Sequence, residues 1–436
     1  MKIAFYTLGC KVNHYETEKL GGEFIAAGFE VVPFSERADV YVINTCTVTA
    51  VSGAKSRKAI ARARKMNSEA IVAVMGCYSE LEEIEADIVR GTKDREEIFN
   101  DIMKRVNLGE IGERVSDYKL SRTRASIKIQ DGCDNFCAYC IIPHARGSEV
   151  FRGVDEVIAE AEGLDAAEMV LVGIHVSSHP NLREIVERLP AERVRLGSLE
   201  PHDLDGELIR WMGECEKLCP HFHLSLQSGC DSVLERMGRK YTFEEYYEKV
   251  SLFRAAIPNV SITTDVIVGF VGETDEEFEI GLENIRRCGF AKVHVFPYSV
   301  RERTLAADAE YIRRHGGLVA GEIKKERAGR LMAVAAEMRR EFLEGMVGRR
   351  ERIVWEKRGG YTGNYVRVRA AATPQNPPIF QNPLARVSLY TTTRLLSKSR
   401  RVLRRCRNGE FKAGELVEVE ITGIGANGEE CIGRVV

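Results

Sequence analysis

The stretch Cys133-Asp-Asn-Phe-Cys137-Ala-Tyr-Cys140 places three cysteines on one short segment, directly after a predicted strand that begins at Ile127. Three thiolates on one tight loop can bind three irons of a cubane cluster and leave the fourth iron open to another ligand. A zinc site would need a fourth ligand close to Cys140, and His144 lies beyond Pro143 on a divergent turn. The spacing therefore favours an iron–sulfur cluster with an open iron over a zinc site or three core thiols.

The segment around these cysteines alternates short β-rich runs with helical patterns as far as about Phe296. Patterns such as Phe243–Ala256 and Asp275–Cys288 separate the runs and predict helices. The predicted strands after Ile127 are Met169–Val172, Val194–Leu199, Phe222–Leu226, Ile262–Val268 and Val293–Phe296. Repeated βα units of this kind predict a partial βα barrel with parallel strands.

The first part of the chain shows the same alternation and predicts an open parallel α/β sheet. Its predicted strands are Ile3–Leu8, Val40–Asn44 and Ala70–Met75, and its predicted helices are Tyr15–Ala27, Ser52–Lys65 and Ser79–Val89. Cys10, Cys46 and Cys77 each follow one of these strands, so all three belong to the carboxyl edge of the sheet. Ligands collect at that edge, and the three thiols can converge there on a second metal cluster. The alternative is that cysteine, being small and apolar, simply suits strand ends.

Composition fits a cytoplasmic protein with two or three domains. The chain has 436 residues, of which 44% are hydrophobic and 29% charged. It contains no run of roughly 18 apolar residues and no export signal, so its twelve cysteines are expected to stay reduced, without a membrane partner. A net charge of −2 gives no overall nucleic-acid signature, and any polyanion site must therefore come from local basic clusters.

The last part of the chain changes to short alternating strands after a long helical pattern at Ile323–Leu343. The runs Arg352–Glu356, Tyr365–Val368, Leu416–Thr422 and Glu430–Val435 predict a small β-barrel. Residues 373–409 interrupt it with many arginines, four prolines in the first eleven positions and no acidic residue before Gly409. This basic insertion is predicted to be a flexible arm, which either contacts RNA phosphates or is solvated without a role. The predicted domains are 1–120, 125–345 and 347–436.

The cysteine motifs resemble those of a known family. The loop at Cys133, Cys137 and Cys140 is similar to the signature of the radical S-adenosylmethionine superfamily, and Tyr139 stands where that superfamily places an aromatic ring against the bound adenine. Three further motifs, Gly9-Cys10-Lys11-Val12-Asn13, Asn44-Thr45-Cys46 and Gly76-Cys77, resemble the methylthiotransferases. The stretch Tyr6-Thr-Leu-Gly-Cys-Lys-Val-Asn13 looks like the branch that acts on threonylcarbamoyladenosine in tRNA.

The resemblance implies two [4Fe-4S] clusters, one on each cysteine trio, and S-adenosylmethionine as the other cofactor. It implies methylthiolation at C2 of N6-threonylcarbamoyladenosine next to the anticodon, with a TRAM-like barrel holding the tRNA and an electron donor such as flavodoxin or ferredoxin. The cofactors rather than side chains would carry the chemistry. Further stretches of family pattern end at predicted strand ends, and the residue types there suggest contacts to S-adenosylmethionine from Gly173, Ser198, Glu200 and Gln227.

Several alternatives stay open at this point. The substrate could be an isopentenyl-modified adenosine or an aspartate of a ribosomal protein, or the chain could be an RNA-binding protein with non-catalytic clusters. The family pattern is broken at Val271, where proline is expected, and along Tyr298–Leu305. A zinc-like spacing of Cys215, Cys219, His221 and His223 is disfavoured because it straddles a helix end and a strand. No role is assigned to Cys230, Cys288, Cys406 and Cys431.

Overall fold

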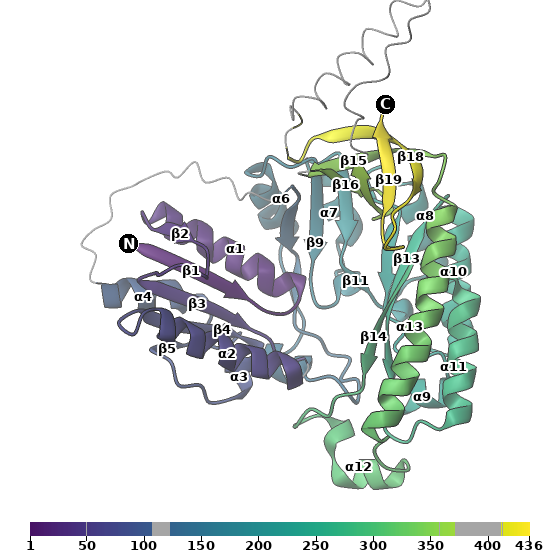
Figure 1. Ribbon diagram of the computed structural model, residues 1–436, viewed down its shortest axis with the longest axis horizontal. Coiled ribbons are helices and arrows are strands. Elements are labelled where there is room, and N and C mark those ends of the chain that lie inside the picture. Colours follow the sequence, from purple (N-terminus) through teal and green to yellow (C-terminus); the bar gives the residue numbers. More distant parts are fainter. Residues whose placement is uncertain (49, 107–122, 357, 371–410, 412) are drawn as a thin grey trace, which may run out of the picture.

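The computed structural model describes residues 1–48, 50–106, 123–356, 358–370, 411 and 413–436. An amino-terminal sheet, a central set of parallel strands and a carboxy-terminal barrel are visible as separate layers in Figure 1. The amino-terminal sheet has five parallel strands in the order β2-β1-β3-β4-β5. They are β1 (Lys2–Thr7), β2 (Glu30–Val32), β3 (Val40–Thr45), β4 (Ile71–Gly76) and β5 (Ile88–Val89).

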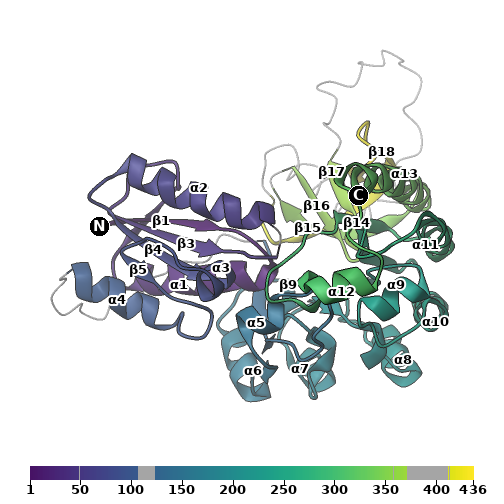
Figure 2. The ribbon, with the colours of Figure 1, turned by 90° about the horizontal axis from the view of Figure 1, so that it is seen from below.

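Helices cover both faces of this sheet because alternate residues of its strands point to opposite sides. Helices α1 (Lys11–Ala26) and α4 (Glu97–Val106) pack on one face, where Phe24 and Ile102 meet Val42. Helix α2 (Ala50–Met66) packs on the other face, where Ala63 meets Ile43. Figure 2 shows α2 on one side of the strands and α1 and α4 on the other.

Six parallel runs form the central part. They are β6 (Ala125–Lys128), β9 (Glu168–Val172), β10 (Arg193–Leu196) with β11 (Ser198–Leu199), β12 (His221–Leu224), β13 (Ser261–Val268) and β14 (Lys292–Pro297). Gly197 lies between β10, which pairs with β9, and β11, which pairs with β12, so the run passes from one sheet to the next. The strand order is therefore that of an open, partial barrel.

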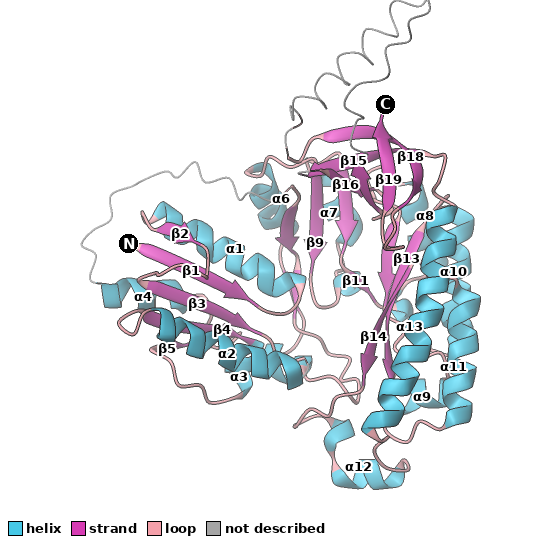
Figure 3. Cartoon of the chain, viewed as in Figure 1, coloured by secondary structure: helices cyan, strands magenta, loops and turns pink. Residues whose placement is uncertain are grey.

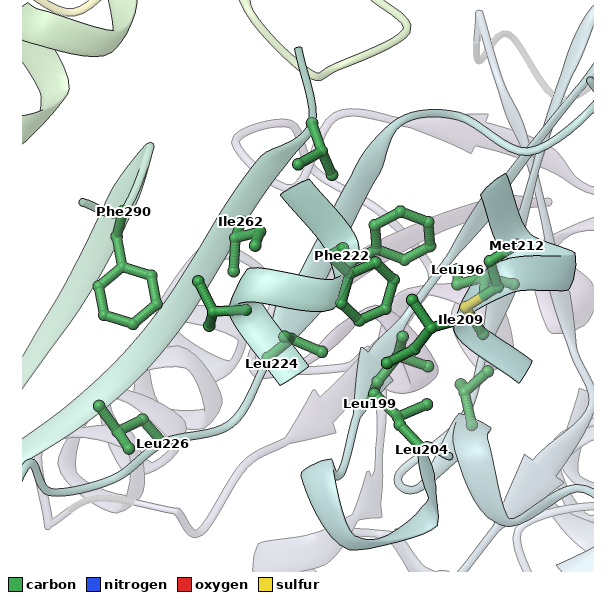
Figure 4. Close-up of a cluster of buried hydrophobic side chains, with 14 of the residues drawn as sticks. Leu196, Leu199, Leu204, Ile209, Met212, Phe222, Leu224, Leu226, Ile262 and Phe290 are labelled. Carbon is green, nitrogen blue, oxygen red and sulfur yellow. The ribbon is translucent and has the colours of Figure 1, made fainter. Parts of the chain in front are cut away.

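Helices on the outside of the central strands complete the hydrophobic core of the central part. They are α6 (Val154–Glu162), α7 (Leu182–Arg188), α8 (Gly206–Glu214), α10 (Phe243–Ala256), α11 (Asp275–Cys288) and α13 (Gly321–Glu344), and they stand outside the strands in Figure 3. Figure 4 shows Phe222 among Leu196, Ile209 and Met212, all buried. Shorter helices α3 (Cys77–Leu81), α5 (Ile142–Arg146), α9 (Asp231–Arg236) and α12 (Ala309–Arg314) and a hairpin of β7 (Gln130–Asp131) with β8 (Val150–Phe151) fill the connections.

The carboxy-terminal strands close into a barrel in the order β15-β16-β17-β19-β18. These strands are β15 (Arg350–Glu356), β16 (Gly359–Thr362), β17 (Arg367–Ala370), β18 (Leu416–Ile424) and β19 (Cys431–Val435). A buried ion pair fixes the barrel to the central part, since Arg195 binds Glu168 at 2.9 Å and also donates to the carbonyl oxygens of Thr362 and Gly363. Breaking such a pair would leave a buried charge without a partner.

The structure confirms the predicted fold class of an open parallel sheet, a partial βα barrel and a small closed β-barrel. One predicted element is wrong: residues 79–89 do not form a helix. Helix α3 ends at Leu81, Glu82 is extended, and Ile88 pairs with Ala73 as part of β5. The basic insertion at 373–409 lies outside the described residues. No helix in the described ranges has both the length and the apolar character that crossing a bilayer requires.

Candidate metal centres and the cavity between them

Cys133, Cys137 and Cys140, here called the loop trio, lie between β7 and α5 on a loop with special backbone geometry. Gly132 has φ +69°, and a side chain there would meet the Ser148 carbonyl oxygen at 2.0 Å. The amide of Cys140 donates to the carbonyl of Cys137 at 2.9 Å, which tightens the turn. Burial and, to a smaller extent, the neighbouring Cys137 and Cys133 raise the pKa of Cys140 to about 12, because nearby thiolates repel each other.

Two charged side chains missed by the sequence analysis contact the loop trio. Arg239 donates to the sulfur of Cys137 at 3.4 Å and forms an ion pair with Glu200. His175 lies between Glu149 at 2.6 Å and Asp203 at 2.5 Å. Burial opposes protonation of His175, but hydrogen bonds to Asp203 and Cys133 raise its pKa to about 10. Both cations lower the electrostatic cost of thiolates in the loop.

The residues predicted to contact S-adenosylmethionine lie in different places in the structure. Tyr139 and Glu200 surround Arg239, with the Tyr139 ring edge-on to Phe270 at 6.3 Å.

Gly173 and Ser198 line a cavity of about 690 Å³. Gly173 is tightly backed, because a side chain there would meet Gln130 at 2.9 Å. Gln227 has φ +71° and donates its amide to the carbonyl of Asp265 on β13. The cofactor roles of all five residues stay predictions.

Cys10, Cys46 and Cys77, here called the sheet-edge trio, meet at the carboxyl ends of β1, β3 and β4. Cys10 precedes the first residue of α1, and Cys77 is the first residue of α3. A side chain on Gly9 would lie 3.1 Å from the Cys46 sulfur. Burial raises the pKa of Cys77 to about 12, and the neighbouring Cys10 and Cys46 thiols contribute to the same shift.

Both trios have the chemistry of a cluster site. All six cysteines are free thiols. Among the described residues, a few groups have possible ligand atoms that all lie within 4.8 Å of one another. Neither complete cysteine trio is such a group. Three thiolates bound to one zinc ion would lie within that distance of one another, whereas the thiolates of a cubane lie farther apart because each binds a different iron. The spacing and the donor atoms therefore fit iron–sulfur clusters.

Arg146 connects the two trios, and the sequence analysis missed it. It lies in α5, immediately after the loop trio, and its side chain is fully buried. It donates to Asn13 at 2.7 Å, to Asp131 at 2.7 Å and to Glu16 at 3.1 Å. It also lowers the pKa of Cys77 against the effect of burial. The sequence marks Arg146 only by its position, shortly after Cys140 and directly before Gly147.

The departure from the family pattern at 298–305 also contacts the sheet-edge trio's surroundings. Arg301 donates to the hydroxyl of Thr47 at 3.1 Å, and Arg303 donates to the carbonyl of Leu81 at 2.7 Å. Thr47 follows Cys46 directly, and Leu81 ends the helix that begins at Cys77. Val271, the other departure, is fully buried in a cluster with Phe270.

The cavity of about 690 Å³, here called the central cavity, touches all three parts of the molecule. Cys10 and Lys11 line it from the amino-terminal part, and Tyr361 and Tyr365 line it from the barrel. Gly173 and Ser198 line it from the central strands. Cys10 of the sheet-edge trio therefore lines the same space as two of the predicted cofactor contacts.

A second cavity of about 990 Å³, here called the basic cavity, shares Lys11, Tyr365 and Arg367 with the central cavity. Its remaining charged side chains are mostly basic and are Arg124, Arg195, Arg358, Arg369 and Glu356. Arg124 lies over the Tyr361 ring at 4.7 Å. The surrounding protein lowers the pKa of Lys11, and Arg195 and Arg124 lower it further. Excess positive charge of this kind favours an anionic ligand.

Comparison with known proteins places the chain in a family. Residues 127–283 match the Radical SAM superfamily, and residues 2–95 match a family described as Uncharacterized protein family UPF0004. The structure of the radical S-adenosylmethionine methyltransferase TsrM from Kitasatospora setae is similar in fold, with a TM-score of 0.51 and 16% identity over 70% of this chain and 77% of that chain.

Full-length relatives narrow the assignment. The chain is 38% identical to the threonylcarbamoyladenosine tRNA methylthiotransferase MtaB of Bacillus subtilis, over 84% of this chain and 89% of that protein. It is 36% identical to the protein of the same name from Aquifex aeolicus, over 85% and 96%. A tRNA-2-methylthio-N(6)-dimethylallyladenosine synthase of Jannaschia sp. is 30% identical, over 84% and 86%. The chain therefore belongs to the radical S-adenosylmethionine methylthiotransferases and is most similar to their threonylcarbamoyladenosine tRNA branch.

Proposed function

We propose that this protein transfers a methylthio group to C2 of N6-threonylcarbamoyladenosine next to the anticodon of tRNA. The single observation that carries the proposal is the central cavity, because one wall holds Cys10 of the sheet-edge trio and another holds Gly173 and Ser198. A base in this cavity would face Cys10 and two of the residues predicted to contact S-adenosylmethionine. The identity to relatives that carry this activity in their names supports the choice of substrate.

Cys133, Cys137 and Cys140 would hold one [4Fe-4S] cluster, and Cys10, Cys46 and Cys77 would hold the other. When bound, these clusters and S-adenosylmethionine supply the radical that activates the substrate carbon and the sulfur that it receives. Tyr139, Gly173, Ser198, Glu200 and Gln227 would bind and orient S-adenosylmethionine. Arg239 and Arg146 would hold the two sets of thiolates in place, because each contacts a cysteine of one trio.

The barrel and the basic cavity would bind the RNA. Arg358 and Arg369 are exposed on the barrel and would contact phosphates, which needs charge but no base reading. Tyr361 and Tyr365 stack on each other at 5.0 Å, and both line the central cavity. Single-stranded loops are commonly read with bases turned out against such surfaces. We assign residues 1–120 to the sheet-edge cluster, 125–345 to radical chemistry and 347–436 to RNA binding.

The setting of the reaction follows from the same proposal. The tRNA substrate places the activity in the cytoplasm, and a flavodoxin or ferredoxin is the expected electron donor. The basic insertion at 373–409 would add phosphate contacts.

The decisive experiment supplies purified, anaerobically reconstituted enzyme with anticodon stem-loops that carry either threonylcarbamoyladenosine or isopentenyladenosine. Nucleoside mass spectrometry should show the methylthio product only with the first, and iron analysis should give about eight irons per chain. Product only with the second stem-loop would change the substrate assignment. No product and no 5′-deoxyadenosine after reduction would instead favour an RNA-binding protein with non-catalytic clusters.

A further inference from the structure

Lys11 is one of the basic residues that line the central cavity without an ion pair to a described carboxylate, and it is the one that directly follows Cys10. It is the first residue of α1, directly after Cys10, and it lines both the central and the basic cavity. Its side chain is solvent-exposed, and no carboxylate of the described residues lies within ion-pair distance of its ammonium group. By contrast, Asp265 of the same cavity pairs with His223 at 3.4 Å. Lys11 is therefore free to bind an anion that enters the cavity.

The shape of a purine places the substituent of the proposed substrate beside this lysine. C2 and the N6 amino group flank the same ring nitrogen, N1, so both project from one edge of the adenine. If C2 faces the sheet-edge trio, the N6 substituent lies next to the residues around that trio. Lys11 is such a residue, since it follows Cys10 in sequence and shares the cavity with it.

The cavity wall also carries several polar side chains, which suit a substituent with a hydroxyl and a carbamoyl group. His223 bonds to the Thr263 hydroxyl at 3.0 Å, and both residues line the cavity. His221, only 4% exposed, has a buried ring nitrogen, Nδ1, that finds no hydrogen-bond partner among the described residues. Buried polar groups are normally paired, so this nitrogen indicates an incomplete network. An apolar isopentenyl group would leave Lys11 and these groups without partners.

We infer that Lys11 selects the substrate by binding the carboxylate of the threonylcarbamoyl group, with His223 and Thr263 near its uncharged polar groups. This inference rests on the proposed function and adds the residue that distinguishes the two kinds of modified adenosine. A site built for a charged partner rejects an analogue without it strongly, because the cation is then desolvated without compensation.

The test measures binding of three stem-loops of one sequence, carrying threonylcarbamoyladenosine, its neutral methyl ester or unmodified adenosine. Fluorescence anisotropy with the cluster-loaded protein should show the acid bound about 10- to 100-fold more tightly than the ester, as expected for one charge-assisted hydrogen bond. Lys11→Met should remove this preference, so that the acid and the ester bind with the same affinity. Lys11→Arg should restore most of it.

Lys19→Met is the matched control, because Lys19 is an exposed lysine on the same helix outside both cavities. It should behave as the unaltered protein does. Iron content of Lys11→Met must equal that of the unaltered protein, and a variant that has lost its cluster is replaced by Lys11→Gln. Retention of the acid-over-ester preference in Lys11→Met would overturn the inference, even if methylthio product forms. Product only on isopentenyladenosine would instead overturn the proposed function.

Discussion

Cys133, Cys137 and Cys140 share one loop, whereas Cys10, Cys46 and Cys77 come from the ends of three neighbouring strands. The loop trio depends on local geometry such as the left-handed Gly132. The sheet-edge trio depends on the whole sheet and on Arg146, which reaches it from the central part. A site made by one loop tolerates distant changes, and a site made by the fold inherits the stability of every contact that holds its strands together.

The largest expected effect comes from removing one cysteine of each trio. Cys137→Ala should abolish cleavage of S-adenosylmethionine, because the loop trio would no longer hold an open iron. Cys46→Ala should leave that cleavage intact and stop sulfur insertion. The two products, 5′-deoxyadenosine and the methylthio nucleoside, can be measured in one assay by mass spectrometry. Full methylthio product from Cys46→Ala would show that the sheet-edge trio has another role.

Arg146→Gln should impair the sheet-edge trio but not the loop trio, although no cysteine is changed. It leaves Glu16 and Asp131 buried, but Arg95 and Lys128 still pair with them. We therefore expect a loss of about 2–3 kcal/mol in the free energy of unfolding, at or below the usual cost of breaking a buried pair. Iron content should fall from about eight toward about four per chain as the sheet-edge cluster is lost.

Arg239→Gln is the matched comparison, since Arg239 contacts the loop trio instead. It should reduce cleavage of S-adenosylmethionine and leave the sheet-edge cluster in place. Equal iron loss in both variants would mean that the two sites are not independent.

Acid should weaken the contact between the amino-terminal and central parts. Although burial opposes it, Arg146, Lys128 and Arg95 lower the pKa of Asp131 and of Glu16 below their ordinary values. Carboxyls with a lowered folded-state pKa stabilise the protein above their unfolded pKa of about 4, and this stabilisation is lost as the pH falls through the folded value. Urea unfolding at about pH 6 and about pH 3.5 should therefore show a smaller loss for Asp131→Asn than for the unaltered protein. An identical loss in both proteins would contradict this.

The smallest effect is expected at the 298–305 segment. Arg303→Ala removes one partly buried hydrogen bond to Leu81 and should cost about 1 kcal/mol. Hydrogen exchange of residues 78–81 should become faster, with iron content unchanged. Arg314→Ala, which removes only an exposed pair with Glu310, is the control and should leave this exchange as it was.

Both cysteine trios could be predicted from the sequence, because their cysteines follow strands with clear hydrophobic runs. The short strands β2, β5 and β16 were missed because each has four residues or fewer. The wrong helix at 79–89 followed from the acidic residues Glu82, Glu83 and Glu85, which favour helices until pairing of Ile88 with β4 overrides them.

The side chains that support the clusters were harder to find. Arg146, Arg239 and His175 reach cysteines that are distant in sequence or on another element, and single-sequence spacing carries no signal for such contacts. Lys11 was visible only as part of a family motif, and its role depends on which cavity it enters.

Helix α1 has a consequence for engineering. One side of it packs on its own sheet, while Val12 and Tyr15 pack against Val170 and Val172 of β9. Tyr15 also donates to Glu160 of α6 at 3.0 Å. A chimaera that grafts the first hundred residues of another family member onto this chain would have to match that second face of α1. Without the match, the donor sheet would pack in a different position, and its cluster cysteines would not face the central cavity.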